Sequence, residues 1–153
     1  MKRFNIFLFI LLIVVMLGGC TEEKNSAKKE MINITVIQDG VQLESAGYDM
    51  MVTVDGEEIT AKKNENGYSF EKLNGEIKGS VKFPDWVEVE YGFVNDGSYK
   101  DVSLTVCFEH RENELYASQK LTAVKNGEAV ELFEESFAGI NESRLSVFAK
   151  GGN

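Results

Sequence analysis

The sequence has few of the residues that build catalytic or metal sites. Its 153 residues include two cysteines, one histidine, one tryptophan and one proline. Transition-metal sites usually need three or four His, Cys or carboxylate ligands, and His110 with scattered carboxylates supplies them poorly. The Gly-x-Ser-x-Gly, His-Glu-x-x-His, Gly-x-x-x-x-Gly-Lys and Gly-x-Gly-x-x-Gly motifs are absent after residue 19. We therefore expect no metal, no cofactor and no enzymatic activity.

Basic residues are also scarce. The chain has 16 Lys and Arg against 25 Asp and Glu, a net charge of −9. Nucleic-acid phosphates bind to basic surfaces, so a nucleic-acid partner is not expected. If Lys2 and Arg3 are removed with an export signal, the net charge falls to about −11, which would attract a cationic peptide or a basic cell-wall partner.

The first 19 residues have the organisation of an export signal. Lys2 and Arg3 precede an almost wholly apolar run from 4 to 16, and Leu17-Gly18-Gly19 leads into Cys20. An uncleaved membrane anchor is the alternative, since about 20 apolar residues can span a bilayer. The small residues before a cysteine favour cleavage.

This segment resembles the signal of bacterial lipoproteins, whose lipobox is a Leu, two small residues and a Cys. The resemblance implies cleavage before Cys20 and a diacylglyceryl thioether, usually with further acylation, on Cys20. Two or more acyl chains anchor a protein stably. Residues 20–30 then form the lipidated cysteine and a flexible polar tether. The resemblance therefore implies that the protein is anchored to the extracytoplasmic face of the cell membrane.

The remaining residues, 31–153, show strand and turn signals. Asn or Asp followed by Gly favours the tight turn of a β-hairpin. The six such dipeptides are Asp39-Gly40, Asp55-Gly56, Asn66-Gly67, Asn74-Gly75, Asp96-Gly97 and Asn126-Gly127. This frequency predicts many short strands in a single domain of 31–153.

Apolar residues alternate with polar ones between these turns, as expected for strands with one buried face. The runs are Ile32, Ile34, Val36; Val87, Val89, Tyr91, Phe93; Val102, Leu104, Val106, Phe108; and Leu145, Val147, Ala149. The clearest predicted hairpin joins 87–95 to 100–109 through Asp96-Gly97. The segment 128–137 is the best helical candidate and reads equally well as an exposed strand, so we expect little helix.

These signals predict an all-β, antiparallel two-sheet sandwich that is monomeric. Pro84, in Phe83-Pro84-Asp85-Trp86, is interpreted as marking the crossing between the sheets, where its missing N–H does least harm. The order of strands and turns in 87–150 resembles bacterial immunoglobulin-like and fibronectin-type adhesion or accessory domains. The resemblance implies a binding or structural module and transfers no functional residue.

Cys107 and His110 are the two reactive side chains of the domain, and we expect them to act separately. Residues three apart in a strand point to opposite faces, with Cα atoms roughly 10 Å apart. Cys107 is therefore interpreted as a small residue on a partly covered strand. His110 lies in the charged segment 109–113, which reads as a solvated turn. With Cys20 acylated, Cys107 has no partner for an intramolecular disulfide.

Three further groups of side chains are candidate sites. The oxygens of 95–98 and Asp101 suggest calcium, but an EF-hand pattern is missing and a hairpin turn explains them better. Glu88 and Glu90 lie on one strand face, about 7 Å apart, as carboxylate pairs commonly do. Trp86 could form a sugar platform with Tyr91, Tyr99 and Tyr116, but a residue of the core or its lid is the favoured interpretation.

The sequence thus predicts a lipid-anchored cell-envelope protein whose sandwich is a non-catalytic binding or accessory module for an envelope protein or peptide. One alternative is an immunity-type lipoprotein that sequesters a cationic peptide. The other is a hydrolase with a composite carboxylate site. The ligand, the number of host membranes, the strand order and any role of the acidic surface are left open by the sequence.

Overall fold

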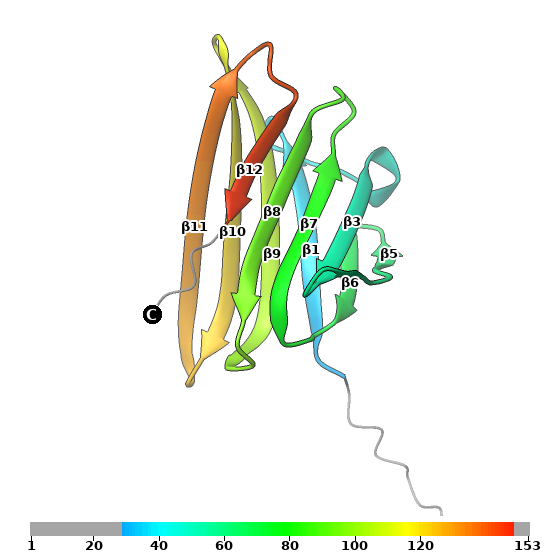
Figure 1. The fold of residues 1–153 in the computed structure, drawn as a ribbon, viewed down its shortest axis with the longest axis vertical. Helices are drawn as coiled ribbons and strands as arrows, with labels where there is room; N and C mark the ends of the chain where they lie inside the picture. Colours follow the sequence, from blue (N-terminus) through cyan, green and yellow to red (C-terminus); the bar gives the residue numbers. More distant parts are fainter. Residues whose placement is uncertain (1–28, 149–153) are drawn as a thin grey trace, which may run out of the picture.

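The computed structural model describes residues 29–148, which form twelve β-strands and one turn of 3₁₀ helix (Figure 1). The 3₁₀ turn, η1, covers Ser45–Gly47. The strands are β1 Met31–Gln38, β2 Val41–Gln42, β3 Asp49–Val54, β4 Glu57–Glu58, β5 Lys62–Asn64, β6 Gly67–Glu71, β7 Gly75–Lys82, β8 Glu88–Asn95, β9 Tyr99–Arg111, β10 Glu114–Lys125, β11 Glu128–Gly139 and β12 Arg144–Phe148.

The strands form two sheets that pack face to face. The seven-stranded sheet has the order β11-β10-β9-β1-β6-β5, with β2 paired to β1, and the five-stranded sheet has the order β12-β8-β7-β3-β4. The predicted all-β, two-sheet architecture is confirmed. The prediction of purely antiparallel sheets is wrong, because β1 runs parallel to β9 and β12 runs parallel to β8. In both cases strands distant in sequence meet as neighbours, which local turn signals cannot indicate.

The core lies between the sheets and is formed by the alternating apolar runs. Every described member of the four predicted runs is buried, whereas Ala149 lies outside the described residues. The largest fully buried side chains include Tyr91, Phe70 and Phe83. The period-two pattern therefore identified the inner face of each of these strands correctly.

Three of the six turn dipeptides form the predicted tight hairpins. Asp39-Gly40, Asp55-Gly56 and Asn126-Gly127 each have positive φ at both positions and join directly paired strands. This is the geometry of a type I′ turn, whose twist matches that of the strands. In the β5–β6 hairpin the central residues are 65 and 66, one residue before the predicted dipeptide.

The predicted hairpin across Asp96-Gly97 is wrong. β8 lies in the five-stranded sheet and β9 in the seven-stranded sheet, so residues 96–98 cross between sheets. The buried Asn95 stabilises the crossing, because its Nδ2 donates to Leu73 O at 2.7 Å and its Oδ1 accepts from Gly97 N at 3.2 Å. Asn74-Gly75 also lies at a crossing, between β6 and β7. The dipeptide favours a reversal of the chain but does not specify which sheet the next strand joins.

Pro84 does not mark a crossing either. It lies in the short connection between β7 and β8, which are neighbours in one sheet. Phe83 N donates to Val87 O at 2.8 Å and Trp86 N donates to Phe83 O at 3.0 Å, which closes the connection as a tight turn. The missing N–H of Pro84 is harmless at this position because the turn uses only its neighbours.

The segment 128–137 is a strand rather than a helix. It belongs to β11, at the border of the larger sheet, where its residues alternate between half-buried and exposed. In residues 29–148 the only helical turn is η1, so the expectation of little helix is confirmed for this range.

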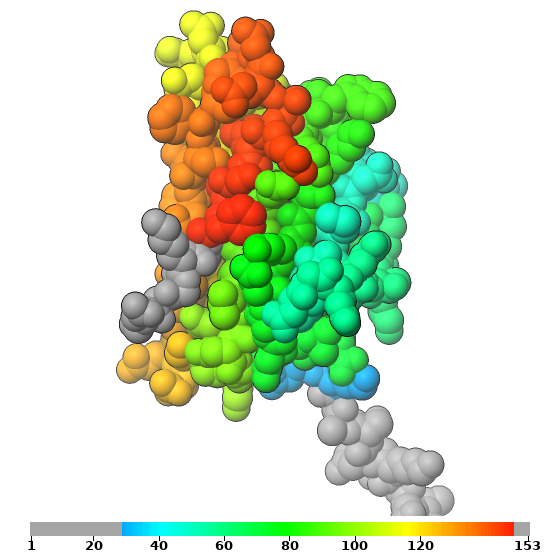
Figure 2. Space-filling model, viewed as in Figure 1, coloured from blue at the N-terminus to red at the C-terminus, as the bar shows by residue number. Residues whose placement is uncertain are grey.

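The sandwich has two distinct ends. β1 begins at the end we call proximal, where the β6–β7, β8–β9 and β10–β11 connections also lie (Figure 1). The opposite, distal end carries η1 and the β7–β8, β9–β10 and β11–β12 connections. Figure 2 shows the face formed by β12, β8, β7 and β3, with β11 along its left border.

Candidate functional site

The β7–β8 turn places Trp86 at the distal end. Trp86 has a φ of 64° and a side chain that is 76% exposed. Both features are unfavourable for tryptophan, because positive φ strains residues with a Cβ and exposure of the indole leaves apolar surface in water. Strained, exposed residues concentrate at functional sites. The interpretation of Trp86 as a core or lid residue is therefore wrong.

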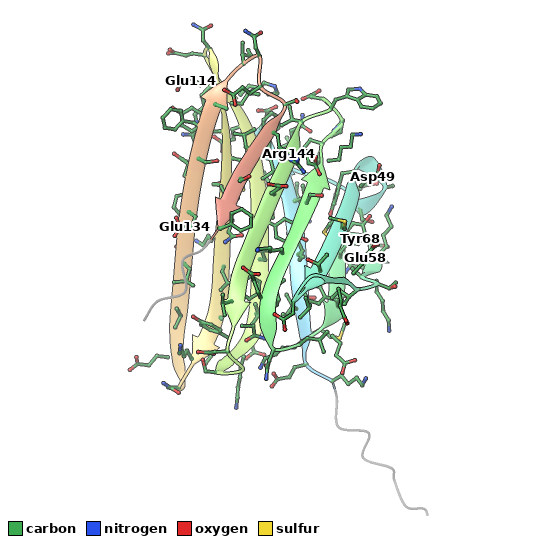
Figure 3. All side chains as sticks on the ribbon, viewed as in Figure 1. Asp49, Glu58, Tyr68, Glu114, Glu134 and Arg144 are labelled. Atoms are coloured by element: carbon green, nitrogen blue, oxygen red, sulfur yellow. The ribbon has the colours of Figure 1, made fainter. Side chains whose placement is uncertain are left out.

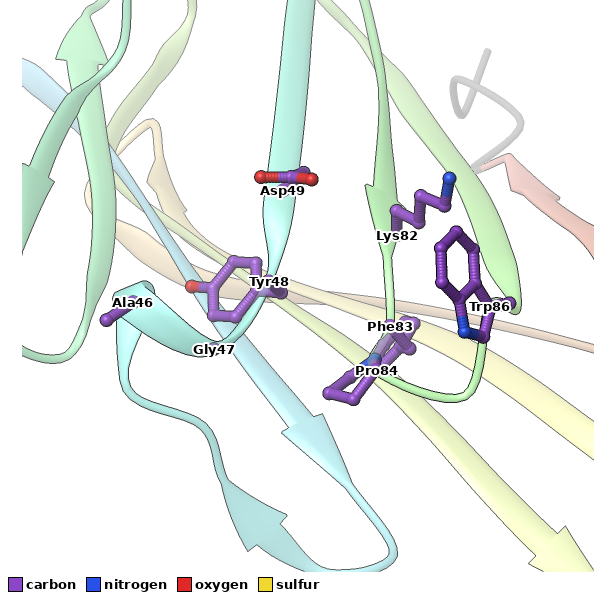
Figure 4. Close-up of a pocket in the computed structure, with 8 residues that line it drawn as sticks. All are labelled: Ala46, Gly47, Tyr48, Asp49, Lys82, Phe83, Pro84 and Trp86. Atoms are coloured by element: carbon purple, nitrogen blue, oxygen red, sulfur yellow. The ribbon is translucent and has the colours of Figure 1, made fainter.

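A shallow groove of about 270 Å³ lies between the β7–β8 turn and η1 (Figure 4). Lys82 places its Nζ 4.7 Å from the Trp86 ring centroid, which covers one face of the indole with a cation. The exposed faces of the groove thus combine apolar, cationic and acidic groups. Its lining residues are Ala46, Gly47, Tyr48, Asp49, Lys82, Phe83, Pro84 and Trp86.

Tyr48 forms the rigid base beside this groove. Its side chain is buried, and its ring packs against Tyr68 with centroids 5.5 Å apart. Burial, with a smaller contribution from Tyr68, raises the pKa of Tyr48 to about 12. Its phenol is therefore neutral at physiological pH, so that Lys82 and Asp49 carry the charge of the groove.

His110 lies at the same end, at the close of β9. Its Nδ1 is 3.0 Å from Asp39 Oδ2, and its Nε2 is 3.8 Å from Asp85 Oδ2. The ring packs edge-on against the buried Phe108, with centroids 4.8 Å apart. His110 is thus a strand residue held between two turns, rather than part of the solvated turn that the sequence predicted. The sequence gives no signal for the contacts of His110 with Asp39 and Asp85, because both residues are distant from it in the chain.

Asp39 connects the β1–β2 turn to β9. Its N donates to Phe108 O at 2.9 Å, and its Oδ1 accepts from His110 N at 2.8 Å. Partial burial acts to raise the pKa of Asp39, but the hydrogen bonds from the backbone and side chain of His110 outweigh it and lower the pKa. The charged carboxylate therefore stabilises this corner of the distal end.

Cys107 and His110 do not meet. Cys107 projects from the outer face of the larger sheet, opposite Ser118 of β10, whereas His110 shares the inner side with Phe108. The expectation that they point to opposite faces is confirmed. Burial raises the pKa of the Cys107 thiol, and a hydrogen bond with Ser118 only partly opposes this effect. A thiol with a raised pKa is a poor nucleophile at neutral pH.

The aromatic residues proposed to accompany Trp86 are not brought together. Tyr91 and Tyr99 are buried in the core. Tyr116 is on the outer side of the larger sheet, where it stacks on Phe137. The structure therefore provides no shared platform of these four rings.

The acidic groups singled out in the sequence are occupied by local contacts. Arg144 Nη2 lies 3.5 Å from Glu88 and 2.8 Å from Glu90. Hydrogen bonds from the side chain and then the backbone of Ser98 lower the pKa of Asp96 to about 2. The oxygens of Asp96 and Ser98 belong to the sheet crossing at 96–98, not to the hairpin turn that the sequence suggested.

Two findings concern the described range as a whole. Within residues 29–148, no group of three or more His, Cys, Asp or Glu side chains is arranged to hold a metal ion. None of the helical structure in that range is long and apolar enough to cross a membrane. Cys20, the predicted lipidation site, lies outside the described residues.

Comparison of the chain with protein-family models, curated proteins and solved structures finds no match. The function is therefore inferred from the residues of this chain alone.

Proposed function

We propose that this chain is a lipid-anchored cell-envelope protein whose β-sandwich acts as a non-catalytic binding or accessory module. Cys20 carries the lipid, and residues 21–30 connect it to the domain on the extracytoplasmic face of the membrane. In this proposal the sandwich presents a binding surface near the membrane, as immunoglobulin-like and fibronectin-type domains do.

The observation that carries the proposal is the position of Trp86. The tether would enter at the proximal end, where β1 begins, and the β7–β8 turn that carries the exposed Trp86 lies at the opposite end (Figure 1). Its exposure and positive φ both cost stability, which is expected where a residue serves recognition rather than folding. An anchored domain of this shape would hold the groove beside Trp86 away from the bilayer.

The separation of the reactive groups supports a binding role over catalysis. Cys107 and His110 project to opposite sides of β9, and the nitrogens of His110 lie beside Asp39 and Asp85 rather than a nucleophile. General base catalysis needs the base within hydrogen-bond reach of the group it activates. We therefore expect substitutions of Cys107 and His110 to leave partner binding intact.

Metabolic labelling tests the anchor. Cells expressing the full chain or the Cys20→Ser variant are given an alkyne fatty acid, and we expect label only on the unsubstituted chain, in the membrane fraction. Label that persists in the variant, or an unsubstituted chain recovered without lipid, would contradict the anchoring part of the proposal.

Capture from an envelope extract tests the binding part. We expect Trp86→Ala to reduce recovery of a partner at least tenfold, because an exposed aromatic anchor contributes strongly to recognition. Phe148→Ala removes another exposed ring, at the last residue of β12 and away from the distal end where that strand begins, and should not affect this recovery. Equal loss in both variants would contradict recognition at the distal end.

A further inference from the structure

β11 is the longest strand edge without a partner in residues 29–148. It pairs with β10 along its whole length, Glu128–Gly139, and with no strand on its other side. The other border strands are much shorter, with three residues in β5, two in β4 and five in β12. The left border of Figure 1 shows the extent of β11. An unpaired edge of this kind is a template for an additional strand.

The hairpin before β11 determines which backbone groups point outward. Lys125 and Glu128 pair across the two-residue Asn126-Gly127 turn. The residues that close such a turn exchange hydrogen bonds, and bonded and non-bonded pairs alternate along an antiparallel ladder. Even-numbered residues of β11 therefore bond to β10. The outward N–H and C=O groups belong to the odd-numbered residues, Ala129, Glu131, Phe133, Glu135 and Phe137.

The same odd-numbered residues project from the outer face of the sheet. Phe133 is 57% exposed and Phe137 is 66% exposed, while the even-numbered residues from 130 to 138 are all half-buried. Phe137 stacks on Tyr116 with centroids 5.6 Å apart, so its ring is already oriented. A strand added to this edge would place its own side chains directly opposite both phenylalanines.

The charge of β11 favours a basic partner over a second copy of the chain. β11 contains four glutamates and no basic residue. Like charges that face one another across strands are destabilising, so two β11 edges would repel. Glu131 and Glu135 already contact Lys120 and Arg111, at 2.8 and 3.4 Å, in each case through Oε2. A carboxylate accepts several hydrogen bonds, so each can also receive a cation from an added strand.

We propose that the outer edge of β11 binds an extended, cationic, amphipathic peptide segment by strand addition. Its backbone pairs with the odd-numbered residues of β11. One face of the segment carries Lys or Arg opposite Glu131 and Glu135, and apolar side chains opposite Phe133 and Phe137. This alternation of basic and apolar residues over seven positions defines the partner. The surface is separate from the groove at Trp86, so the inference stands independently of the proposed distal site.

A synthetic heptapeptide, Phe-Thr-Lys-Thr-Phe-Thr-Lys, acetylated and amidated, is the probe. In antiparallel pairing its residues 1, 3, 5 and 7 lie opposite Phe137, Glu135, Phe133 and Glu131 and form the bonded pairs of the ladder. It is titrated into the isotopically labelled full chain in mild detergent, and amide hydrogen exchange is followed by NMR. Without peptide, the outward amides of Glu131, Phe133, Glu135 and Phe137 should exchange quickly and their even-numbered neighbours slowly. With saturating peptide, we expect exchange at these four amides to slow at least tenfold, with little change at the even positions.

Two modified peptides separate strand addition from general attraction. N-methylation of both Phe residues removes the backbone donors that would face β11 but keeps charge and apolar surface. A scrambled peptide, Phe-Phe-Lys-Lys-Thr-Thr-Thr, keeps the composition but loses the alternation. Strand addition predicts at least tenfold weaker binding for both, whereas equal binding would overturn the proposal.

Glu135→Pro and Glu135→Ala form the matched pair of variants. Both lose the carboxylate, but only proline removes the outward N–H, and an edge strand tolerates proline at such a position. We expect Glu135→Ala to weaken peptide binding about twofold to fivefold and Glu135→Pro to weaken it at least tenfold. Similar affinities for the two variants, exchange protection without the odd-even pattern, or a dimer formed through this edge in the absence of peptide would each overturn the proposal.

Discussion

Gln119 shows how one residue couples the two sheets. It lies in β10 and is fully buried, and its Oε1 accepts from Gly92 N at 3.0 Å while its Nε2 donates to Gly92 O at 2.8 Å. Gly92 belongs to β8 of the other sheet. The amide side chain therefore satisfies two backbone groups in the way that a neighbouring strand would. This contact explains why the polar residue Gln119 lies in the buried, otherwise apolar row of β10.

Gln119→Leu should remove both hydrogen bonds to Gly92, which lie in the buried core. A hydrogen bond contributes about 0.5–1.5 kcal/mol net, so we expect the free energy of unfolding to fall by about 1–3 kcal/mol in urea denaturation. Gln38→Leu is the control, because the hydrogen bond of the Gln38 amide to Asp85 is exposed to solvent. Similar losses in the two variants would contradict the role of Gln119.

Asp39 gives a pH-dependent contribution to stability. Its folded-state pKa is lowered, so its stabilisation is present above the unfolded-state pKa of about 4 and is lost as pH falls through the folded-state value. Asp39→Asn keeps a residue that tolerates positive φ but removes the charge. Because the Asp39 side chain is 44% exposed and solvent screens its charge, we expect a loss of only about 0.2–1 kcal/mol at pH 7 that disappears as the carboxylate becomes protonated at low pH. A difference that stays constant across urea titrations at these pH values would contradict this assignment.

At the scale of elements, the β7–β8 turn can be tested for strain. Trp86→Gly relieves the positive φ, whereas Trp86→Ala keeps it, so the Gly variant should be the more stable by about 1 kcal/mol. Asp85 is the matched site because its φ is not positive. There, Ala should be more stable than Gly. Thermal denaturation of the four variants would show whether the order reverses between the neighbouring positions.

The sequence predicted individual strands far better than their pairing. Alternation identifies the inner face of a strand because burial follows a period of two, and this holds for 87–93 and 102–108. Pairing depends on where the chain goes after a turn. Asp96-Gly97 and Asp39-Gly40 carry the same kind of local signal, yet one crosses between sheets and the other closes a hairpin.

The candidate site was less predictable than the strands. Trp86 is the single tryptophan of the sequence, but its exposure depends on the tight turn closed between Phe83 and Val87. Asp39 and His110 are 71 residues apart in the chain and meet because β1 and β9 run parallel. Long-range contacts of this kind leave no periodic pattern in one sequence. The three-residue spacing of Cys107 and His110, in contrast, indicated correctly that the two side chains point to opposite faces of β9.

At the scale of the whole molecule, the direction of β1 relates the proposed anchor to the groove. β1 has eight residues, which corresponds to about 26 Å at roughly 3.3 Å per residue. It begins at the proximal end, and the β7–β8 turn lies at the other end (Figure 3). A lipid on Cys20 would therefore leave Trp86 more than a strand length from the point where the domain meets its tether.

Intrinsic fluorescence can test this arrangement because Trp86 is the only tryptophan. In the lipidated protein on vesicles, we expect an emission maximum typical of water-exposed indole, efficient quenching by acrylamide and no quenching by brominated lipids. The double variant Trp86→Phe and Leu73→Trp moves the single indole to the β6–β7 connection at the proximal end, where Leu73 is 37% exposed. Brominated lipids should quench this variant measurably more than the unsubstituted protein, because contact quenching acts over a distance much shorter than the sandwich. Equal quenching of both, or strong quenching of Trp86, would mean that the domain lies along the bilayer, with the distal groove against lipid instead of facing an envelope partner.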